Sequence, residues 1–307
     1  MSAKYVLAIL GLLLCAGLVI AVAVFAWQHY SGAEAKIQQE QKIAALDRAD
    51  RINSIPKIIH QIWIGDKAEP PMQWIETWSK DFVEQNPGYV HVLWRDEDLK
   101  ILEMVNRDLY DAEPTLPGKA DIARYELLRR YGGVYIDADI VWLGKRLPET
   151  QQPFASRDET SAFDSFLAKT NPEAKIFVAC EPHNVDNVGQ WQKIGTSEND
   201  LKQTDCLLYA NSIIGASPEN PHVLTIIKHI AATYAKRSAE NPAQPWLTTG
   251  PFPMTEALRP IDNVTVFASD IFYPADWHAD HSAKTVEQLR QLYPDAYTFH
   301  YGYSTGS

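Results

Sequence analysis

Cysteine is scarce in this chain of 307 residues: only Cys15, Cys180 and Cys206 occur, without a CxxC pair or a Cys/His pair at zinc-binding spacing. A structural zinc site is therefore not expected. Cations are also in the minority, since 28 Lys and Arg stand against 39 Asp and Glu, giving a formal net charge of −11. This balance argues against a protein that binds nucleic acid through a basic surface. An acidic enzyme acting on an anionic substrate needs a metal ion or a few well-placed cations.

A long run without charge lies near the start of the chain. From Tyr5 to Trp27 no side chain is charged, and as a helix this run spans roughly 35 Å, enough to cross a hydrocarbon core of about 30 Å. We predict a single-pass membrane anchor at residues 5–27, after a short tail at residues 1–4. The alternative is a cleaved signal peptide, because Ala21-Val22-Ala23 has the small-x-small form of a cleavage site.

Three weaker features bear on which side of the membrane the C-terminal domain would lie. Lys4 precedes the run whereas Lys36 and Lys42 follow it, so the positive-inside count does not favour an N-in arrangement. Asn263-Val264-Thr265 is a glycosylation sequon. The two downstream cysteines either pair in an oxidising compartment or remain buried thiols. For a eukaryotic source we predict a type II protein of the ER or Golgi with a lumenal C-terminal domain.

Two regions follow the predicted anchor. Residues 28–53 are rich in Ala, Gln, Glu and Lys, which predicts a helical stem. Over residues 54–307 strand and helix patterns alternate, which is typical of one α/β domain. We expect a loop at Leu116-Pro117-Gly118 and left-handed caps at Gly132-Gly133. Expected strands cover 58–64, 89–94 and 134–142, and expected helices cover 72–84, 96–105 and 119–131.

The strand expected at 134–142 contains two acids, Asp137 and Asp139, where a central parallel strand should be continuously apolar. Carboxylates one residue apart point to the same side of a strand, so both reach one ion if the strand ends at the carboxyl edge of the sheet. Oxygen ligands suit Mg²⁺ or Mn²⁺, which can also bridge a diphosphate. Taken alone, the pair is equally explained as a helix cap or a loop.

The preceding helix adds a second polar pair. Asp121 and Arg124 are three residues apart and share one helix face, close to Tyr125. They form either a surface ion pair of little energetic value or a binding pair, in which Arg124 holds a carboxylate or phosphate and Asp121 accepts sugar hydroxyls.

These residues carry a family resemblance. Residues 119–139, KADIARYELLRRYGGVYIDAD, and residues 55–65, IPKIIHQIWIG, resemble the glycosyltransferases with a DXD-containing sugar-binding region. That family includes fungal initiating mannosyltransferases, inositol-phosphorylceramide mannosyltransferases and α-galactosyl- or α-N-acetylglucosaminyltransferases. The resemblance implies a GT-A fold, a Rossmann-like and mostly parallel sheet flanked by helices. It also implies a nucleotide-sugar donor, a divalent metal on the DXD and transfer with retention of configuration.

Roles follow from the resemblance residue by residue. It implies that Asp139 binds the metal directly and that Asp137 contacts the donor ribose or sugar and also belongs to the metal site. Both acids would act in catalysis. Asp121 and Arg124 would hold the donor, and Arg124 would also act in catalysis. His300, in YTFHYGY, stands where relatives complete the metal or phosphate site, although the Ser-x-Trp ending that often follows is missing here. A surface histidine is the alternative at this position.

The resemblance implies five further donor contacts. Trp63 occupies the place of a tryptophan that stacks on the nucleotide base, with Ile62 beside it; an ordinary core indole is the alternative. Tyr135 precedes the DXD. Asn211 lies in YANSIIGASPENPH, and Gly250 lies in the TGP turn near the sugar.

The resulting prediction is a metal-dependent retaining hexosyltransferase. It would move mannose, galactose or N-acetylglucosamine from a GDP- or UDP-sugar to a glycan or lipid-linked acceptor. One alternative is a non-catalytic sugar-binding module. The other is a phosphatase of the Asp-x-Asp type, with Asp137 as nucleophile.

Overall fold

The computed structural model describes residues 42–44, 46, 49–65, 69–144, 163–182, 206–275, 281 and 283–302. The chain divides into two compact units, Met1–Arg48 and Ala49–Ser307, so the second unit begins slightly before the boundary predicted at residue 54. The predicted anchor at 5–27 and most of the predicted stem at 28–53 lie outside the described residues. Among the helices that are described, none has the length and apolarity needed to cross a membrane.

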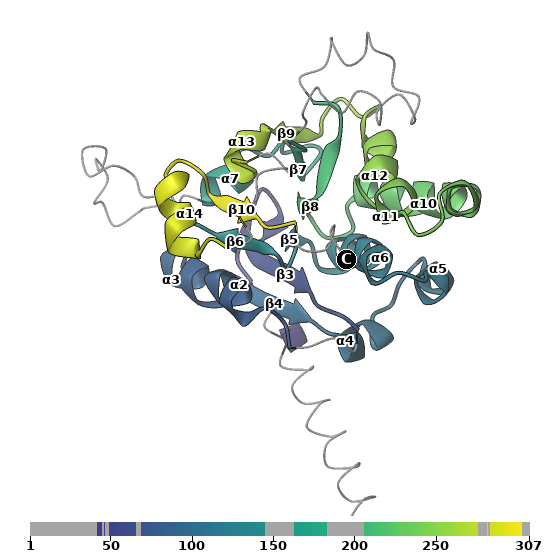
Figure 1. The fold of residues 1–307 in the computed structure, drawn as a ribbon. Coiled ribbons are helices and arrows are strands. Elements are labelled where there is room, and N and C mark those ends of the chain that lie inside the picture. Colours follow the sequence, from purple (N-terminus) through teal and green to yellow (C-terminus); the bar gives the residue numbers. More distant parts are fainter. Residues whose placement is uncertain are drawn as a thin grey trace, which may run out of the picture. The chain divides into compact units, whose positions relative to one another are not determined.

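A six-stranded sheet forms the centre of the second unit (Figure 1). β3 pairs in parallel with β4 and β5, and β7 pairs in parallel with β9, whereas β8 is antiparallel to both of its neighbours. Five strands therefore run in one direction, which confirms the predicted mostly parallel α/β sheet. Their carboxyl ends meet at one edge, where such sheets bind ligands. The strand order is β4 (Val90–Trp94), β3 (Ile58–Ile62), β5 (Gly133–Ile136), β8 (Tyr209–Ala216), β7 (Ile176–Cys180) and β9 (Thr265–Phe267).

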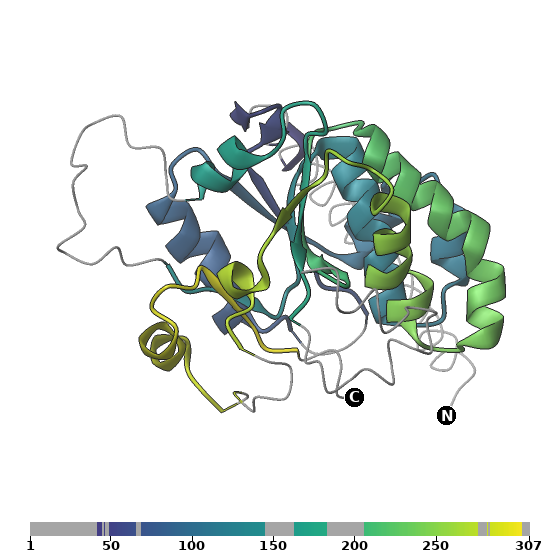
Figure 2. The ribbon, with the colours of Figure 1, turned by 90° about the horizontal axis from the view of Figure 1, so that it is seen from above.

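Helices cover both faces of this sheet (Figure 2). One face carries α6 (Leu116–Tyr131), α10 (Pro221–Glu240), α11 (Pro245–Thr248) and α12 (Pro251–Leu258). The opposite face carries the run α2 (Met72–Glu76), η1 (Thr77–Phe82) and α3 (Val83–Gln85), together with α13 (Ser269–Phe272). The remaining elements are β1 (Arg51–Ile52), β2 (Ile55–Pro56), α4 (Asp96–Ile101), α5 (Arg107–Ala112), β6 (Ile140–Trp142), α7 (Asp164–Lys169), α14 (Val286–Leu292) and β10 (Thr298–His300).

The single strand predicted over 134–142 is wrong. β5 ends at Ile136, and the chain then turns, with the Ile140 N–H donating to the Asp137 carbonyl at 3.1 Å. β6 leaves the main sheet and pairs antiparallel with β10, which sets Ile140 opposite His300. The two acids therefore occupy a turn between two sheets, where carboxylates are not buried among apolar strands.

The helix predicted over 72–84 is confirmed, but its middle is a π-helix at Thr77–Phe82. This wider turn holds β6: the Thr77 hydroxyl accepts from the Trp142 N–H at 2.9 Å, and the Trp78 indole donates to the Ile140 carbonyl at 2.7 Å. The Trp78 ring belongs to the hydrophobic core and lies 5.6 Å from the Trp142 ring. π-bulges of this kind often lie beside functional sites.

The loop predicted at 116–118 is wrong, because α6 begins at Leu116. Thr115 caps the helix, and its hydroxyl accepts from the Gly118 N–H at 3.1 Å. Pro117 is tolerated because the first helical turn has no internal partner for its missing N–H. The helix ends at the predicted glycines, and Gly132 and Gly133 have positive φ of 65° and 91°. The ψ of Gly132 is −155°, so this residue does not adopt the predicted left-handed helical conformation.

A disulfide joins Cys180, at the end of β7, to Cys206, just before β8, with a Cα–Cα distance of 5.6 Å. The sequence left open whether these cysteines form a disulfide or remain buried thiols, and the structure has the disulfide. The double variant Cys180→Ser with Cys206→Ser should lose about 2–4 kcal/mol of unfolding free energy, because the unfolded chain regains the freedom of the closed loop. Denaturant titration measures this loss. Reductant should lower the wild-type midpoint and leave the variant unchanged; equal wild-type midpoints with and without reductant would contradict the prediction.

Candidate active site

The turn between β5 and β6 is held through its backbone by three other elements. The Asp137 N–H donates to the Ser212 carbonyl of β8 at 2.9 Å, and the Gln61 amide of β3 donates to the Asp137 carbonyl at 3.2 Å. The Tyr301 N–H, just after β10, donates to the Asp139 carbonyl at 3.0 Å. The DXD segment is thus fixed at the carboxyl end of β5, which is the condition under which we expected both acids to reach one ion.

Three side chains meet at this turn. Asp137, Asp139 and His300 each offer one ligand atom, and these atoms lie within 4.8 Å of one another. The His300 Nε2 lies 3.1 Å from the Asp139 Oδ1, because the β6–β10 pairing carries His300 to the end of the turn. His300 is therefore not a surface histidine. Two carboxylates and one imidazole form a donor set that fits a divalent cation such as Mn²⁺.

The pKa shifts of Asp137 and His300 indicate how a bound cation would change the electrostatics of this group. Burial raises the pKa of Asp137, and the Asp139 carboxylate raises it further, while Arg124 and His300 act in the opposite direction. For His300, burial lowers the pKa, but the combined effects of Asp139, Asp137 and Glu181 outweigh it and the net pKa is raised. Neighbouring acids thus repel each other here, and a bound cation would relieve that repulsion.

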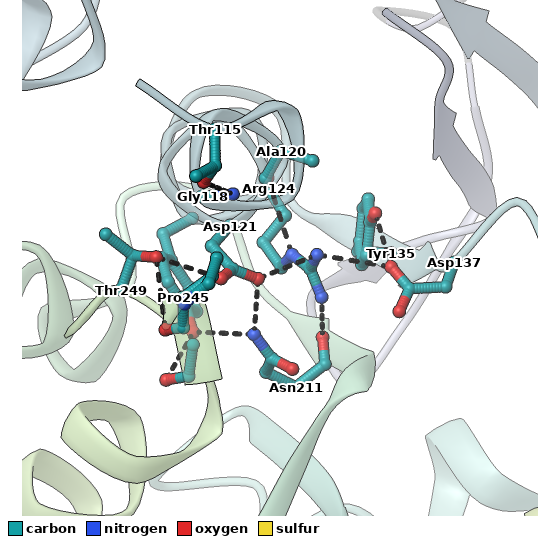
Figure 3. A network of polar contacts seen from close by, with 12 residues as sticks. Thr115, Gly118, Ala120, Asp121, Arg124, Tyr135, Asp137, Asn211, Pro245 and Thr249 are labelled. Carbon is teal, nitrogen blue, oxygen red and sulfur yellow. Dashed lines mark hydrogen bonds and ion pairs between the residues drawn. The ribbon is translucent and has the colours of Figure 1, made fainter. Parts of the chain in front are cut away.

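Arg124 links this group to α6 (Figure 3). Its Nη2 lies 2.9 Å from the Asp121 Oδ1 and 3.2 Å from the Asp137 Oδ1, and its Nη1 donates to the Asn211 carbonyl at 2.7 Å. The guanidinium also lies over the Tyr135 ring at 4.5 Å, and the Tyr135 hydroxyl donates to the Asp137 Oδ1 at 2.7 Å. The side chains of Arg124 and Asp121 are only 5% and 8% exposed, so this is not a surface ion pair.

Both oxygens of Asp121 accept hydrogen bonds. The Asn211 amide donates to Oδ1 at 2.8 Å and the Thr249 hydroxyl donates to Oδ2 at 2.9 Å. Burial is the main cause that raises the pKa of Asp121 to about 6. At Gly250 an added Cβ would lie 3.1 Å from the Asp121 Oδ2, so the missing side chain lets the TGP turn approach α6.

The sequence analysis did not select Thr249, although it used the TGP segment that contains it. The sequence feature that could have selected Thr249 is its hydroxyl, directly before Gly250. Its role becomes visible only when the fold brings α11 against the buried carboxylate of α6.

A bulge in β8 orients Asn211. Val178 of β7 pairs with Ile214, but the next residue, Ala179, pairs with Ala210, so residues 211–213 are additional on β8. Asn211 faces α6, whereas the Ser212 hydroxyl lies 2.6 Å from the Tyr273 hydroxyl. β-bulges redirect side chains in this way next to binding sites.

Trp63 and Ile62 lie at the carboxyl end of β3, at the same edge of the sheet. Ile62 pairs with Trp94 and is 5% exposed, so its side chain belongs to the core. Trp63 is partly exposed and its N–H donates to the Trp94 carbonyl at 3.0 Å. Trp63 thus lies partly exposed at the same edge of the sheet as the DXD turn, and its role as a stacking residue stays a prediction.

A mostly parallel sheet with a buried arginine and a carboxylate–imidazole group at its carboxyl edge defines an α/β protein with a candidate metal and phosphate site. Residues 71–155 match the family described as "Glycosyltransferase sugar-binding region containing DXD motif". This match confirms the family resemblance inferred from the sequence.

Curated relatives agree with this assignment. Inositol phosphoceramide mannosyltransferase 3 of Schizosaccharomyces pombe is 38% identical over 93 residues, which are 28% of this chain and 25% of that protein. Glycosyltransferase L373 of Acanthamoeba polyphaga mimivirus, an uncharacterized protein, is 33% identical over 92 residues, which are 28% of this chain and 36% of that protein. The chain thus spans between a quarter and a little over a third of the length of these relatives.

Two solved structures align with most of the chain at low sequence identity. The PaToxG glycosyltransferase aligns with a TM-score of 0.43 and 16% identity, over 74% of this chain and 76% of that one. The UDP-bound glycosyltransferase domain of the YGT toxin aligns with a TM-score of 0.41 and 12% identity, over 71% of this chain and 80% of that one.

Proposed function

We propose that this chain is a metal-dependent, retaining hexosyltransferase with a GT-A fold. It transfers mannose, galactose or N-acetylglucosamine from a GDP- or UDP-sugar to a glycan or glycolipid acceptor. The observation that carries this proposal is the group of Asp137, Asp139 and His300, whose ligand atoms lie within 4.8 Å and which Arg124 joins to α6.

Each polar side chain then has a task. Asp139, Asp137 and His300 hold Mn²⁺ or Mg²⁺, and the bound cation supplies positive charge that stabilises the departing diphosphate. Arg124 presents its guanidinium beside Asp137, where a phosphate oxygen or a donor hydroxyl can reach it. Asp121 and Asn211 fix the orientation of Arg124 and present oxygens toward the sugar, while Trp63 stacks on the base.

Mannose is the first donor sugar to test. The fission-yeast relatives that share 34–38% identity with this chain are named inositol phosphoceramide mannosyltransferases. Inositol phosphoceramide is correspondingly the first acceptor to test. A lipid-linked acceptor is consistent with an enzyme held at a membrane surface.

Residues 5–27 are proposed as that membrane anchor, in a single-pass arrangement. For a eukaryotic source the catalytic domain would lie in the lumen of the ER or Golgi, as a type II protein. The Cys180–Cys206 disulfide supports an oxidising compartment, because such bonds persist there and are rare in the cytosol.

A panel of substrates separates the candidate functions. The full chain is incubated with Mn²⁺ and with GDP-mannose, UDP-galactose, UDP-N-acetylglucosamine or p-nitrophenyl phosphate, and product release is followed. Cleavage of one nucleotide sugar supports the transferase. Cleavage of the phosphate ester alone would mark the Asp137 phosphatase, and no cleavage would mark a sugar-binding module.

A further inference from the structure

Gln61 is a buried amide on β3, a strand inside the main sheet. β3 lies between β4 and β5, and Gln61 is 0% exposed. An inner strand of a parallel sheet is covered on both faces and normally carries apolar side chains. A buried amide lowers the stability of a fold unless its hydrogen bonds are satisfied. The partners of Gln61 therefore indicate its role.

Gln61 forms hydrogen bonds in the direction of both neighbouring strands. Its Nε2 donates to the carbonyl of Asp137, directly after β5, at 3.2 Å, and its Oε1 lies 2.8 Å from the Nε2 of His91 on β4. In the register of β3 and β4, His91 pairs with Ile59, which shares a face of the sheet with Gln61. The His91 and Gln61 side chains therefore meet diagonally across the two strands.

The direction of these hydrogen bonds is fixed at the Asp137 end. A backbone carbonyl only accepts, so the Gln61 NH₂ group faces Asp137 and the Oε1 faces His91. This oxygen also only accepts, which assigns the proton of the neutral His91 ring to Nε2. Burial, followed by the effect of His60, lowers the pKa of His91 to about 4, so the ring is neutral near pH 7. The His91 N–H thus holds the Gln61 amide in the orientation that donates to Asp137.

The Asp137 carbonyl belongs to the peptide plane between Asp137 and Ala138, directly between the two acids of the DXD. It also accepts from the Ile140 N–H at 3.1 Å, which closes the turn. The orientation of a planar peptide unit sets the backbone dihedral angles on both of its sides, and so it determines where the Asp137 and Asp139 side chains point. Hydrogen bonds that orient metal ligands from outside commonly change metal affinity by about 10–100-fold.

We propose that Gln61 and His91 are positioning residues that hold the DXD turn in the conformation that binds the divalent cation, an inference that rests on the proposed metal-dependent function. In this role neither residue is a metal ligand. Gln61 fixes the peptide plane between the two acids, and His91 keeps the Gln61 amide from rotating. Without these bonds the turn samples other conformations, so the cation binds more weakly.

Mn²⁺ binding to the full chain tests this role in the absence of donor, with unbound Mn²⁺ followed by its electron paramagnetic resonance signal. Gln61→Met keeps a similar volume but removes the amide, and should raise the Kd for Mn²⁺ by about 10-fold or more. His91→Phe keeps a ring but removes the N–H, and should raise the Kd by a smaller factor, because Gln61 retains its own bond to the turn. His91→Gln supplies another N–H donor and should bind Mn²⁺ more tightly than His91→Phe.

The double variant Gln61→Met with His91→Phe distinguishes a connected pair from two independent residues. If His91 acts only through Gln61, the double variant should bind Mn²⁺ as weakly as Gln61→Met alone, whereas independent effects would multiply. Gln291→Met, at an exposed position on α14, is the matched control and should leave the Kd unchanged. Denaturant titration of each variant establishes that the Kd is measured on folded protein.

A wild-type Kd for Gln61→Met would overturn the proposal, because the turn would then bind the cation without the amide. Losses that multiply in the double variant would show that His91 does not act through Gln61. Equal Kd values for His91→Phe and His91→Gln would also remove His91 from this role, and that comparison does not require Gln61→Met to fold.

The same titrations separate this proposal from the proposed function. A wild-type chain that binds Mn²⁺ but cleaves no nucleotide sugar would overturn the proposed function, while the Kd values would still decide the roles of Gln61 and His91. A wild-type chain that binds no Mn²⁺ would overturn both.

Discussion

Asp139→Asn lowers the kcat of Mn²⁺-dependent nucleotide-sugar hydrolysis by about 10²–10³-fold or more, the loss expected when charge stabilisation is withdrawn from a transition state. The Asp139 oxygen lies with the ligand atoms of Asp137 and His300 and is 6% exposed. An amide cannot supply the negative charge that holds the cation. Initial rates measured at saturating donor and Mn²⁺ check this prediction.

The folded state should tolerate this change. Asp139 raises the pKa of Asp137, so removing its charge removes repulsion between neighbouring acids. The change also weakens the contact of Asp139 with the His300 Nε2 at 3.1 Å, which acts in the opposite direction. We therefore expect an inactive variant whose unfolding free energy changes little. Asp262→Asn removes the same charge at an exposed turn and serves as the matched control. Equal rates for Asp139→Asn and the control would remove Asp139 from the site.

Arg124→Ala is expected to lower both stability and activity. The guanidinium is buried and contacts Asp121, Asp137 and the Asn211 carbonyl within 3.2 Å. Removing it leaves two acids without their cation, and breaking a buried ion pair from one side costs about 3–5 kcal/mol. Denaturant titration measures the stability, and donor hydrolysis by the fraction that remains folded measures the activity.

Arg124→Lys separates the two effects. A lysine keeps the positive charge but cannot contact Asp121, Asp137 and the Asn211 carbonyl together, since it lacks the planar fork of arginine. We expect a smaller loss of stability than in Arg124→Ala and a large loss of kcat. Arg130→Ala, on the same helix but exposed, is the control and should change neither quantity appreciably. An Arg124→Lys variant with wild-type kcat would contradict the proposed role.

The sequence predicted the sheet and most of its helices because their signals are local. Short segments rich in β-branched and aromatic residues predicted β3 and β4, and the paired glycines at 132–133 marked the end of α6. The break after Ile136 was missed because Ile140–Trp142 is as apolar as β5. Only the pairing of β6 with β10, far along the chain, decides that these residues leave the main sheet.

The site residues likewise differ in whether the sequence alone carries a signal for them. Asp121, Arg124, Asp137 and Asp139 lie within one short segment, so their spacing and the family resemblance were enough to select them. Thr249 was not selected, because a single hydroxyl has no distinguishing pattern in the sequence. The tertiary hydrogen bond of Thr249 with Asp121 identifies it.

The central claim is that Asp137, Asp139 and His300 hold a divalent cation that serves sugar transfer. Its most direct test follows the hydrolysis of GDP-mannose, UDP-galactose and UDP-N-acetylglucosamine by the full chain, first with EDTA and then after Mn²⁺ is added in excess. We predict that EDTA abolishes cleavage of the donor sugar and that Mn²⁺ restores it. Cleavage that continues undiminished in EDTA would contradict the account.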